Sequence, residues 1–218
     1  MSIILPGNTT TNVFTLDTAT ARNSKMAFLF KYYKSAAGGF YYHVDTTSGS
    51  PFVKIRGTGR LSFRLATGGW IEPTIAALAT VGEHEVYVEF DFDAGTIEAY
   101  VDGDYTTPAY TNSSVTGDQM HGTSNDIELI GNATDGNDDQ YHNVAVWIGT
   151  LPTTADVQTI MNSATLSASD FAALTNSPNL SVTPYGDGSS YLSTFAWDVG
   201  TGNFAHTQGP TATDNFPY

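Results

Sequence analysis

The chain has 218 residues, of which 40% are apolar and none is cysteine, and only 8 lysines and arginines give it a formal net charge of −14. This length suits one large β-sandwich with a substantial core. The lack of cysteine excludes disulfides and thiolate metal sites. The acidic balance argues against nucleic acids, anionic membranes and strongly acidic polysaccharides as the main ligand.

The beginning of the chain does not have the pattern of a targeting segment. Residues 1–12 (MSIILPGNTTTN) contain a four-residue apolar run without a basic segment before it, so we expect no signal peptide. No stretch approaches the roughly 20 apolar residues of a membrane span, so we expect no membrane insertion. A protein made in a cytoplasm, such as a virion protein, fits both expectations, and so does a chain that is already mature.

Short alternating segments separated by turn residues fill the first half of the chain. This pattern predicts strands at 12–17, 25–34, 40–45, 52–56 and 60–66, a break at Gly68-Gly69 before Trp70-Ile71, and a loop with a short apolar run at 75–78. The strongest hairpin is predicted at 82–103, where apolar residues alternate with polar ones up to the turn Asp93-Ala94-Gly95. These features indicate an all-β protein.

The second half adds strands and two short helices. Pro108 suggests that the segment 105–111 is an edge strand or a bend, and we predict a surface loop at 112–125 and strands at 126–131, 141–149, 180–185 and 191–197. A helix at 155–162 has Thr153 or Thr154 as its N-cap, and a second helix at 167–174 begins with a Ser-x-x-Asp capping box. The tail from Gly200 shows little periodicity.

The hairpin carries a resemblance to a known family. Residues 84–91 (HEVYVEFD) and 100–103 (YVDG) resemble the central hairpin of laminin-G-like domains in the concanavalin A-like lectin/glucanase superfamily, although Glu83 stands where the family has Trp. Residues 127–131, 144–148 and 156–161 are similar to the last third of these domains. The resemblance covers about residues 25–162, a span set by these motifs and their order along the chain.

The resemblance implies a two-sheet antiparallel jelly-roll sandwich with one or two short helices near residues 153–174. We expect residues 1–218 to form a single domain, in which 175–218 is a C-terminal extension that packs on the sandwich or on a neighbour.

Three carboxylates in the hairpin are candidates for catalysis. Glu89, Asp91 and Asp93 alternate along one strand and therefore share a face. They resemble the Glu-x-Asp-x-Glu strand of laminarinase-type glycosidases, and retaining glycosidases need two carboxylates about 5–5.5 Å apart. The alternative is that all three are solvated positions on the outer face, with Asp91 and Asp93 serving the turn.

An acidic loop is a candidate calcium site. Asp135, Asn137 and Asp139 offer the oxygen ligands that Ca²⁺ prefers, although Gln140 breaks the EF-hand pattern. Laminin-G-like domains often bind Ca²⁺ through loops near their rim, so the resemblance makes Ca²⁺ a cofactor to expect. The alternative is an acidic loop exposed to solvent. The five histidines show no zinc-ligand spacing.

Three tyrosines are candidates for ligand binding. Tyr33, Tyr41 and Tyr87 fall opposite the apolar face of their strands, where an exposed ring could stack on a sugar or on a protein partner. The alternative is that they contribute to packing.

These observations favour a non-catalytic binding or structural module on a surface. We expect a virion-associated protein, such as a phage capsid decoration, head-fibre or tail protein, that contacts proteins on a particle or cell surface and glycans, and homo-oligomers are among the options. One alternative is an extracellular, calcium-dependent carbohydrate-binding lectin module. Another is a glycoside hydrolase or polysaccharide lyase of the same fold that uses Glu89, Asp91 and Asp93.

Overall fold

A computed structural model describes the backbone of residues 3–5, 14–17, 24–34, 41–45, 53–56, 58–65, 69–103, 105–115, 126–132, 139–163, 166–178, 180–184, 195–199 and 203–205. Side chains are described for the same residues except 3–5, 14–17, 41–45, 54, 126–132, 139–142, 168, 180–184, 195–199 and 203–205.

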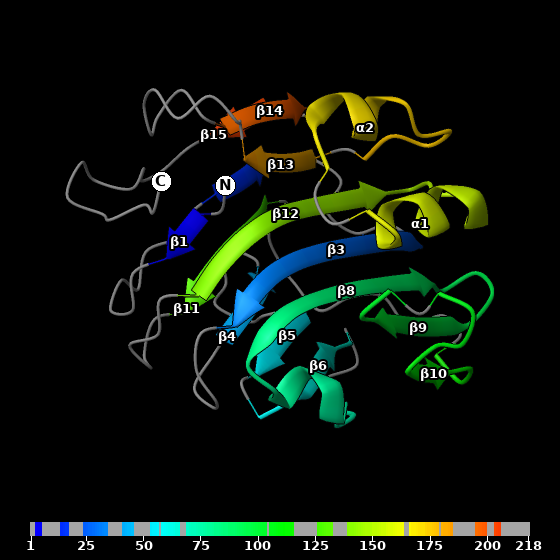
Figure 1. The fold of residues 1–218 in the computed structure, drawn as a ribbon. Coiled ribbons are helices and arrows are strands. Elements are labelled where there is room, and N and C mark those ends of the chain that lie inside the picture. The colour runs from blue at the N-terminus through cyan, green and yellow to red at the C-terminus, as the bar shows by residue number, and fades with distance from the viewer. Residues whose placement is uncertain are drawn as a thin grey trace.

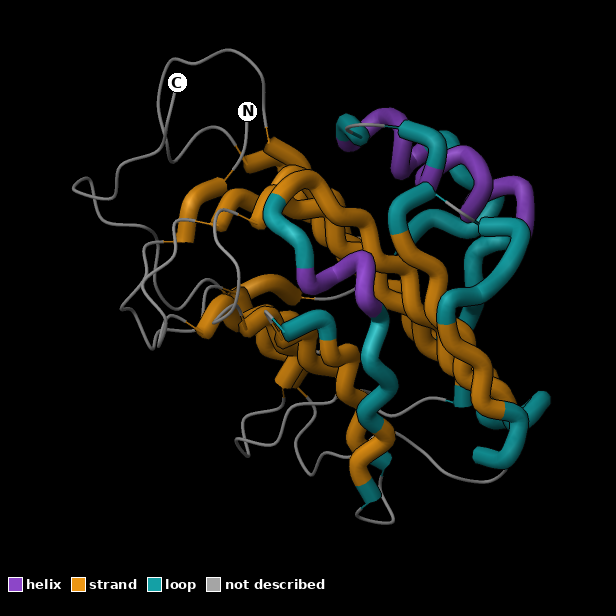
Figure 2. Tube along the Cα trace, turned by 60° about the horizontal axis from the view of Figure 1, so that its bottom comes forward, coloured by secondary structure: helices purple, strands orange, loops and turns teal. Residues whose placement is uncertain are grey.

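Two antiparallel sheets form the described structure (Figures 1 and 2). Sheet A has eight strands; β1 (Ile3–Leu5) pairs with β12, and the other seven lie in the order β10 (Tyr110–Asn112), β9 (Thr96–Val101), β8 (Gly82–Asp91), β3 (Lys25–Lys34), β12 (Asp139–Ile148), β13 (Leu180–Pro184) and β14 (Phe195–Val199). Sheet B has seven strands, in the order β15 (Asn203–Ala205), β2 (Phe14–Asp17), β11 (Asp126–Asn132), β4 (Tyr41–Asp45), β5 (Val53–Arg56), β6 (Arg60–Arg64) and β7 (Trp70–Ile71). The predicted two-sheet antiparallel jelly-roll sandwich is therefore confirmed.

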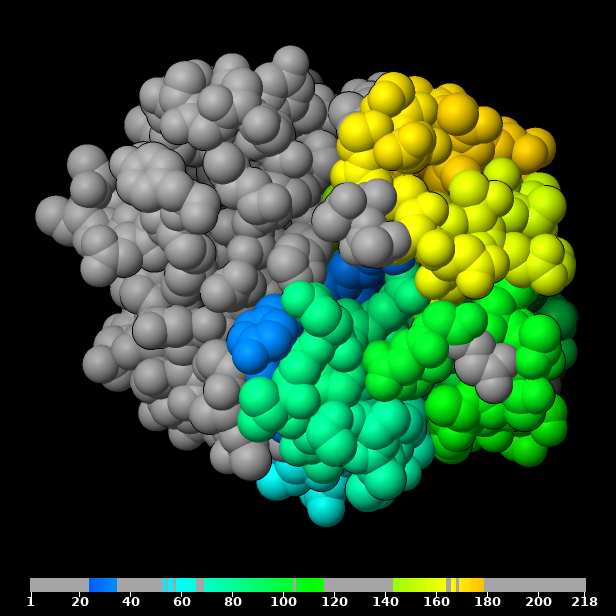
Figure 3. All heavy atoms as spheres, viewed as in Figure 1, coloured from blue at the N-terminus to red at the C-terminus, as the bar shows by residue number. Residues whose placement is uncertain are grey.

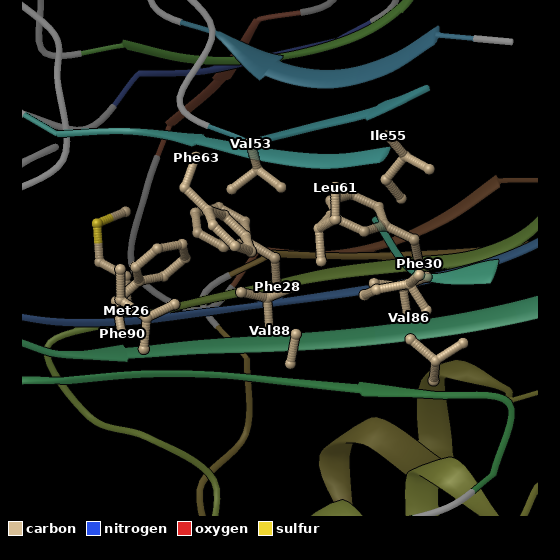
Figure 4. Close-up of a cluster of buried hydrophobic side chains, with 14 of the residues drawn as sticks. Met26, Phe28, Phe30, Val53, Ile55, Leu61, Phe63, Val86, Val88 and Phe90 are labelled. Atoms are coloured by element: carbon tan, nitrogen blue, oxygen red, sulfur yellow. The ribbon is translucent and has the colours of Figure 1, made fainter. Parts of the chain in front are cut away.

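The main core lies between the two sheets. Alternate residues of β3 and β8 point toward sheet B, where they meet the inward side chains of β5 and β6 (Figure 4). The ring of Phe90 lies edge-to-face against Phe28 and Phe63, with centroids 5.9 and 5.5 Å apart. Each such buried side chain contributes about 1.5–3 kcal/mol to folding, so the period-2 pattern of these strands accounts for the sandwich.

Two short helices, α1 (Thr154–Met161) and α2 (Ala168–Ala172), both begin with a capping box. Thr153 and Asp156 cap α1, and Ser167 and Asp170 cap α2, through reciprocal side-chain to backbone hydrogen bonds. Of the two N-caps that the sequence left open for the first helix, the structure selects Thr153.

The helices cover the side of sheet A that faces away from sheet B. A second buried cluster lies between sheet A and the helical segment. Its members are Ala27, Leu29, Tyr87, Tyr100, Ala145, Trp147, Val157, Ile160, Met161, Leu166, Phe171 and Leu174. The space-filling view of this side shows the helical segment in yellow beside the green residues of β9 and β10, with part of β3 visible in blue (Figure 3). The central strands of sheet A are thus buried on both faces, as a sheet between two layers must be.

Buried polar side chains fix this cover to the sheet. The Asn143 amide donates to the carbonyl oxygen of Leu166 (2.8 Å) and accepts from the Leu166 N–H (2.9 Å). The Trp147 indole donates to the Asn176 carbonyl (2.8 Å). The Asp156 carboxylate accepts from the N–H groups of Thr175 (2.9 Å) and Asn176 (3.3 Å), in addition to its role in the cap.

Several details differ from the sequence prediction. The segment 75–78, expected to be a loop, lies largely in a short 3-10 helix η1 (Ala76–Ala79), where the buried Lys34 ammonium donates to the Leu78 and Ala79 carbonyls. β10 is confined to Tyr110–Asn112, after Pro108, and it is the edge strand of the described sheet, as expected.

Differences also occur at the ends of the chain. β14 begins at Phe195, four residues after the predicted start, and the strands β1 and β15 were not predicted because three residues are too few for alternation to be recognised. The described strands of the segment 175–218 join both sheets: β13 and β14 extend sheet A, and β15 pairs with β2 of sheet B. Among the described residues, no helix is long and apolar enough to cross a membrane.

Candidate functional site

The three predicted catalytic carboxylates lie on the outer face of sheet A, near the turn between β8 and β9. Asp91 forms an ion pair with Lys25 (2.9 Å) and accepts from the Ala94 N–H (2.9 Å). Asp93 accepts a hydrogen bond from the Ser24 hydroxyl (3.0 Å). Asp91 and Asp93 therefore hold the turn and the start of β3, which is the alternative that the sequence left open.

Glu89 is paired with a carboxylate that the sequence analysis did not select. The register of the hairpin places Glu98 of β9 directly opposite Glu89. Tyr87 donates to Glu89 (2.9 Å) and Tyr100 donates to Glu98 (2.6 Å), so each carboxylate has its own tyrosine. Counting outward from the turn would have found Glu98, because opposite residues of a hairpin share a face.

The electrostatic setting raises the pKa of Glu89. Burial is the largest cause, and the negative charges of Glu98 and Asp91 act in the same direction, while the hydrogen bond from Tyr87 opposes them. A carboxyl group with a raised pKa beside a second carboxyl group is a residue pair that can carry out acid–base chemistry. The two partly exposed carboxylates are thus the described arrangement closest to a catalytic pair.

The structure corrects one predicted ligand-binding tyrosine. Tyr87 lies opposite the inter-sheet core, as expected, but it is fully buried against Tyr100, Tyr105 and Trp147 and cannot offer its ring to a ligand. The sequence pattern misled because it showed which face Tyr87 is on, but not that the helical segment covers that face. Tyr33 is half-buried, and the prediction that it binds a ligand stays open.

At the other end of β8, two buried ionisable pairs have structural roles. The Lys31 ammonium is bound by Glu85 and by the carbonyl oxygens of Ile160 and Ser163, so it ties the end of α1 to the sheet. Burial raises the pKa of Glu85 to about 7, against the opposing effect of Lys31, and burial lowers the pKa of Lys31.

His84 and Asp102 form the second pair, at the end of the hairpin. The His84 ring lies 3.3 Å from Asp102 and 3.0 Å from the Thr80 carbonyl. The hydrogen bond to Asp102 is the largest effect and raises the pKa of His84, against burial and the charge of Lys34.

The predicted calcium site falls mostly outside the described residues. Residues 135 and 137 are not described, and of Asp139 only the backbone is, as the first residue of β12. Within the part of the chain that the structure describes, no group of three or more His, Asp or Glu side chains is arranged to hold a metal ion. The Ca²⁺ site therefore stays a prediction.

The outer face of sheet B carries a cluster of arginines that the sequence analysis missed. The Glu72 carboxylate lies between Arg56 (3.1 Å) and Arg60 (3.4 Å) and accepts a hydrogen bond from the Ser62 hydroxyl (2.9 Å). Next along β6, the Arg64 guanidinium lies 5.6 Å from the centre of the Trp70 ring. We call Arg56, Arg60, Arg64 and Trp70 the arginine face.

The register of sheet B places further residues opposite the arginine face. Tyr41, the third predicted ligand-binding tyrosine, pairs with Arg56, and His43 pairs with Lys54, which in turn pairs with Ser62. The prediction for Tyr41 stays open, because only its backbone is described. Two strands, β5 and β6, thus contain four of the eight lysines and arginines of the chain.

The fold class of the protein is a two-sheet antiparallel jelly-roll sandwich. The helical segment covers the outer side of sheet A, and sheet B carries the arginine face. No protein-family model matches the chain, and no curated protein matches it. Among solved structures, the chain is similar to the heptameric SAP-like pentraxin from Limulus polyphemus, with 15% identity over 74% of this chain and 81% of that chain and a TM-score of 0.48.

Two other similar structures are longer than this chain. Domains LG4-5 of the mouse laminin alpha1 chain are 17% identical over 66% of this chain and 41% of that chain, with a TM-score of 0.46. The binding domain of botulinum neurotoxin DC, in a complex with SialylT, is 12% identical over 74% of this chain and 45% of that chain, with a TM-score of 0.48. The chain therefore spans less than half of either, and these likenesses identify no ligand for it.

Proposed function

We propose that the protein is a non-catalytic glycan-binding module displayed on a surface. The observation that carries the proposal is Trp70, which is 40% exposed on the outer face of sheet B with the Arg64 guanidinium against its ring. A flat aromatic ring bordered by fixed hydrogen-bond donors is the combination that sugar rings require, because their C–H faces are apolar and their edges carry hydroxyl groups.

The fold supports a rigid binding surface at this place. Val53, Ile55, Leu61 and Phe63 anchor β5 and β6 in the core, so the alternate residues of these strands project outward from a fixed backbone. Glu72, which accepts a hydrogen bond from Ser62, pairs with the guanidinium groups of Arg56 and Arg60, so these side chains lose less conformational entropy when a ligand binds.

A glycan-binding assay with a matched control tests the proposal. The wild-type chain is screened against an array of neutral and acidic glycans, beside Trp70→Ala and Val81→Ala. Val81, at 49% exposed, is another large apolar side chain on the surface, so it controls for the loss of apolar area. We expect binding by the wild type and by Val81→Ala, and its loss in Trp70→Ala; equal binding by all three, or by none, contradicts the proposal.

We place the module on the surface of a virion. The chain's lack of cysteine supports assembly in a reducing compartment such as a cytoplasm. Co-purification of the protein with assembled particles is the expected result, and recovery only as free protein in a culture medium would favour the extracellular alternative.

Calcium is a second component of the proposal. Asp135, Asn137 and Asp139 supply the ligand chemistry, and binding to the folded state alone raises the melting temperature with the logarithm of free Ca²⁺. We expect a rise in Tm on adding Ca²⁺ that is absent in Asp139→Asn and is not produced by Mg²⁺. An unchanged Tm in millimolar Ca²⁺ removes calcium from the proposal.

A glycosidase is the second candidate, because one observation favours it. Glu89 and Glu98 face each other across the hairpin, and the pKa of Glu89 is raised. If they are a catalytic pair, the wild type releases reducing ends from a polysaccharide and both Glu89→Gln and Glu98→Gln abolish this release while they leave the fold intact. If the protein releases no reducing ends from any glycan that it binds on the arrays, the glycosidase hypothesis is wrong and the non-catalytic function is retained.

A further inference from the structure

Three polar residues form a row across the face of sheet A that the helices cover. The register of the sheet places Lys31 of β3 between Glu85 of β8 and Asn143 of β12. Lys31 and Asn143 are buried, and the Glu85 side chain is 13% exposed. Buried polar groups need hydrogen-bond partners, and the backbone of the helical segment supplies them to Lys31 and Asn143. The row therefore attaches this segment to the sheet.

Within the row, Lys31 holds the end of α1. Its ammonium binds the carbonyl oxygens of Ile160 and Ser163, and α1 has no basic residue of its own in its last turn. The last carbonyl groups of a helix lack partners within the helix and carry a partial negative charge, so a cation stabilises them. Glu85 shares the same ammonium. The charge of Glu85 therefore acts directly on this attachment.

The attachment at Lys31 differs from two others because it contains a group that titrates near neutral pH. Burial alone would raise the pKa of Asp156 at the start of α1, but the hydrogen bonds that it accepts lower it, so this carboxylate stays ionised. The amide of Asn143, which holds the link to α2, does not titrate. Burial raises the pKa of Glu85 to about 7. A change between pH 6 and pH 8 thus acts on the end of α1 and spares the other two contacts.

The surroundings of Glu85 favour its protonated form. Burial is the largest cause, and the negative charge of Asp102 adds to it, while Lys31 opposes both. Because the Lys31 ammonium is shared with two carbonyl oxygens of α1, the ion pair does not compensate for the burial of the carboxylate. Asp102 stays close because it accepts a hydrogen bond from the Glu85 N–H (3.1 Å).

His84 acts in the same direction from the other side of β8. It pairs with Asp102 and lies near Tyr32 and Lys34 of β3, on the side of the main core. His84 and Glu85 both have a raised folded-state pKa, so the stability that they contribute is fully present below the ordinary pKa and is lost as the pH rises through the folded one. Of the two, Glu85 lies on the side that α1 covers, so water reaches it when the end of α1 lifts.

We propose that Lys31 and Glu85 form a pH-sensitive attachment for the end of α1. Protonated Glu85 keeps the end of α1 closed on sheet A, and loss of the proton above neutral pH makes this end open more often. Opening gives water access to the apolar cluster that contains Tyr87 and Trp147. The attachment lies on sheet A and is independent of the glycan binding proposed for sheet B.

Amide hydrogen exchange in the full chain, followed by NMR and corrected for the intrinsic effect of pH, measures the opening. The reporters are the N–H groups of Asn162 and Ser163, which donate to the carbonyls of Gln158 (3.1 Å) and Ile160 (3.4 Å). A carboxyl whose pKa falls from about 7 to its ordinary 4.5 on opening raises the opening constant about tenfold between pH 6 and pH 8. We expect the protection of both amides to fall by about this factor.

Two substitutions separate the titration of Glu85 from other effects of pH. Glu85→Gln keeps the shape of the side chain without the titrating group, so protection should vary less than about twofold between pH 6 and pH 8. Glu83→Gln is the matched control, since Glu83 lies two positions earlier on the same face of β8 but is exposed, and it should keep the tenfold change. In the wild type, the carboxyl signal of Glu85 should titrate near pH 7.

Three results would overturn the inference. The first is protection that does not change with pH in the wild type, or a tenfold change that persists in Glu85→Gln. The second is a Glu85 carboxyl that titrates at its ordinary value in the wild type, a measurement that does not depend on the folding of any variant. The third is equal protection of Asn162, Ser163 and the amides of β12, because the end of α1 would then open only when the whole sandwich unfolds.

Discussion

The two outer faces of this sandwich are used in opposite ways. On sheet A, Tyr87, Trp147 and their neighbours are covered by α1, α2 and the loops around them, and buried polar groups fix that cover in place. On sheet B, the described residues of β5–β7 present arginines and an exposed tryptophan. An aromatic residue on the face opposite the main core can therefore serve stability or recognition. Which of the two it serves depends on whether a helical segment covers that face.

The largest effect is expected from Trp147→Ala. Trp147 is fully buried between sheet A and the cover, so its truncation should lower the free energy of unfolding by about 3–5 kcal/mol through lost contacts and a cavity. Urea denaturation followed by circular dichroism measures this loss. A change below about 1 kcal/mol would mean that the cover is not packed on the sheet as described.

Asp156→Ala should have the next largest effect. Three backbone N–H groups, those of Thr153, Thr175 and Asn176, lose their acceptor, so we expect a loss of about 2–3 kcal/mol. Asp170→Ala is the matched control, because Asp170 occupies the same capping-box position in α2 but is exposed, and only a capping effect of about 1 kcal/mol or less is expected. Equal losses in the two variants would contradict the second role of Asp156.

The loss in Asp156→Ala should also depend on pH. Burial alone would raise the pKa of Asp156, but the hydrogen bonds that it accepts outweigh burial and lower it. A lowered folded-state pKa gives stability that is present above the unfolded pKa and is lost as the pH falls through the folded pKa. The difference between wild type and variant should therefore be constant near neutral pH and shrink in strong acid.

A smaller, pH-dependent effect is expected from Asp102→Asn. Asp102 has a positive φ of 56°, which asparagine tolerates, so the substitution removes the charge facing His84 and keeps the turn. Because the folded-state pKa of His84 is raised, its contribution is fully present below the unfolded value and is lost as the pH rises through the folded value.

The stability difference between wild type and Asp102→Asn should therefore grow as the pH falls from 8 to 6. We expect it to reach about 0.5–1 kcal/mol, the range of partly exposed ion pairs. Denaturation curves at both pH values measure it. A larger difference at pH 8 than at pH 6 would contradict the pairing of His84 with Asp102.

The smallest effect on stability is expected from Trp70→Ala. An exposed residue away from the core changes stability by about 0.5 kcal/mol or less, so this variant should unfold like the wild type while it loses glycan binding. Comparing Trp147→Ala with Trp70→Ala therefore distinguishes the outer face that contributes to stability from the one that contributes to binding. A loss of stability above about 2 kcal/mol in Trp70→Ala would show that Trp70 is structural.

The sequence was sufficient for the sandwich because its strands alternate clearly. The hairpin at 82–103, the edge strand after Pro108 and both capped helices were predicted from local rules and are confirmed. The helices were expected as an appendage, whereas they cover the central strands of sheet A on the side facing away from sheet B. The continuous apolar run Ala27-Phe28-Leu29-Phe30 was the available signal, since a strand that is apolar on both faces must be covered on both.

The candidate site was harder to predict because it depends on register. Glu98 lies nine positions after Glu89 in the sequence and became its partner only through the hairpin pairing. Arg56, Arg60 and Arg64 belong to two strands, and Glu72 and Trp70 come from a third segment, so no local motif contains them. Their common feature is a shared face, which needs the strand order as well as the alternation.

The side chain of Asn143 has a mechanical consequence. By exchanging two hydrogen bonds with Leu166, it imitates the bond pair of two neighbouring strands, at the point where the register of β12 shifts between Tyr141 and Asn143. Leu166 lies in the link between α1 and α2, so these two hydrogen bonds attach the link directly to β12 of sheet A. Because Thr175 and Asn176 bond to Asp156 and Trp147, the chain after α2 is held to both α1 and sheet A, and the link at Leu166 is a second, separate attachment to the sheet.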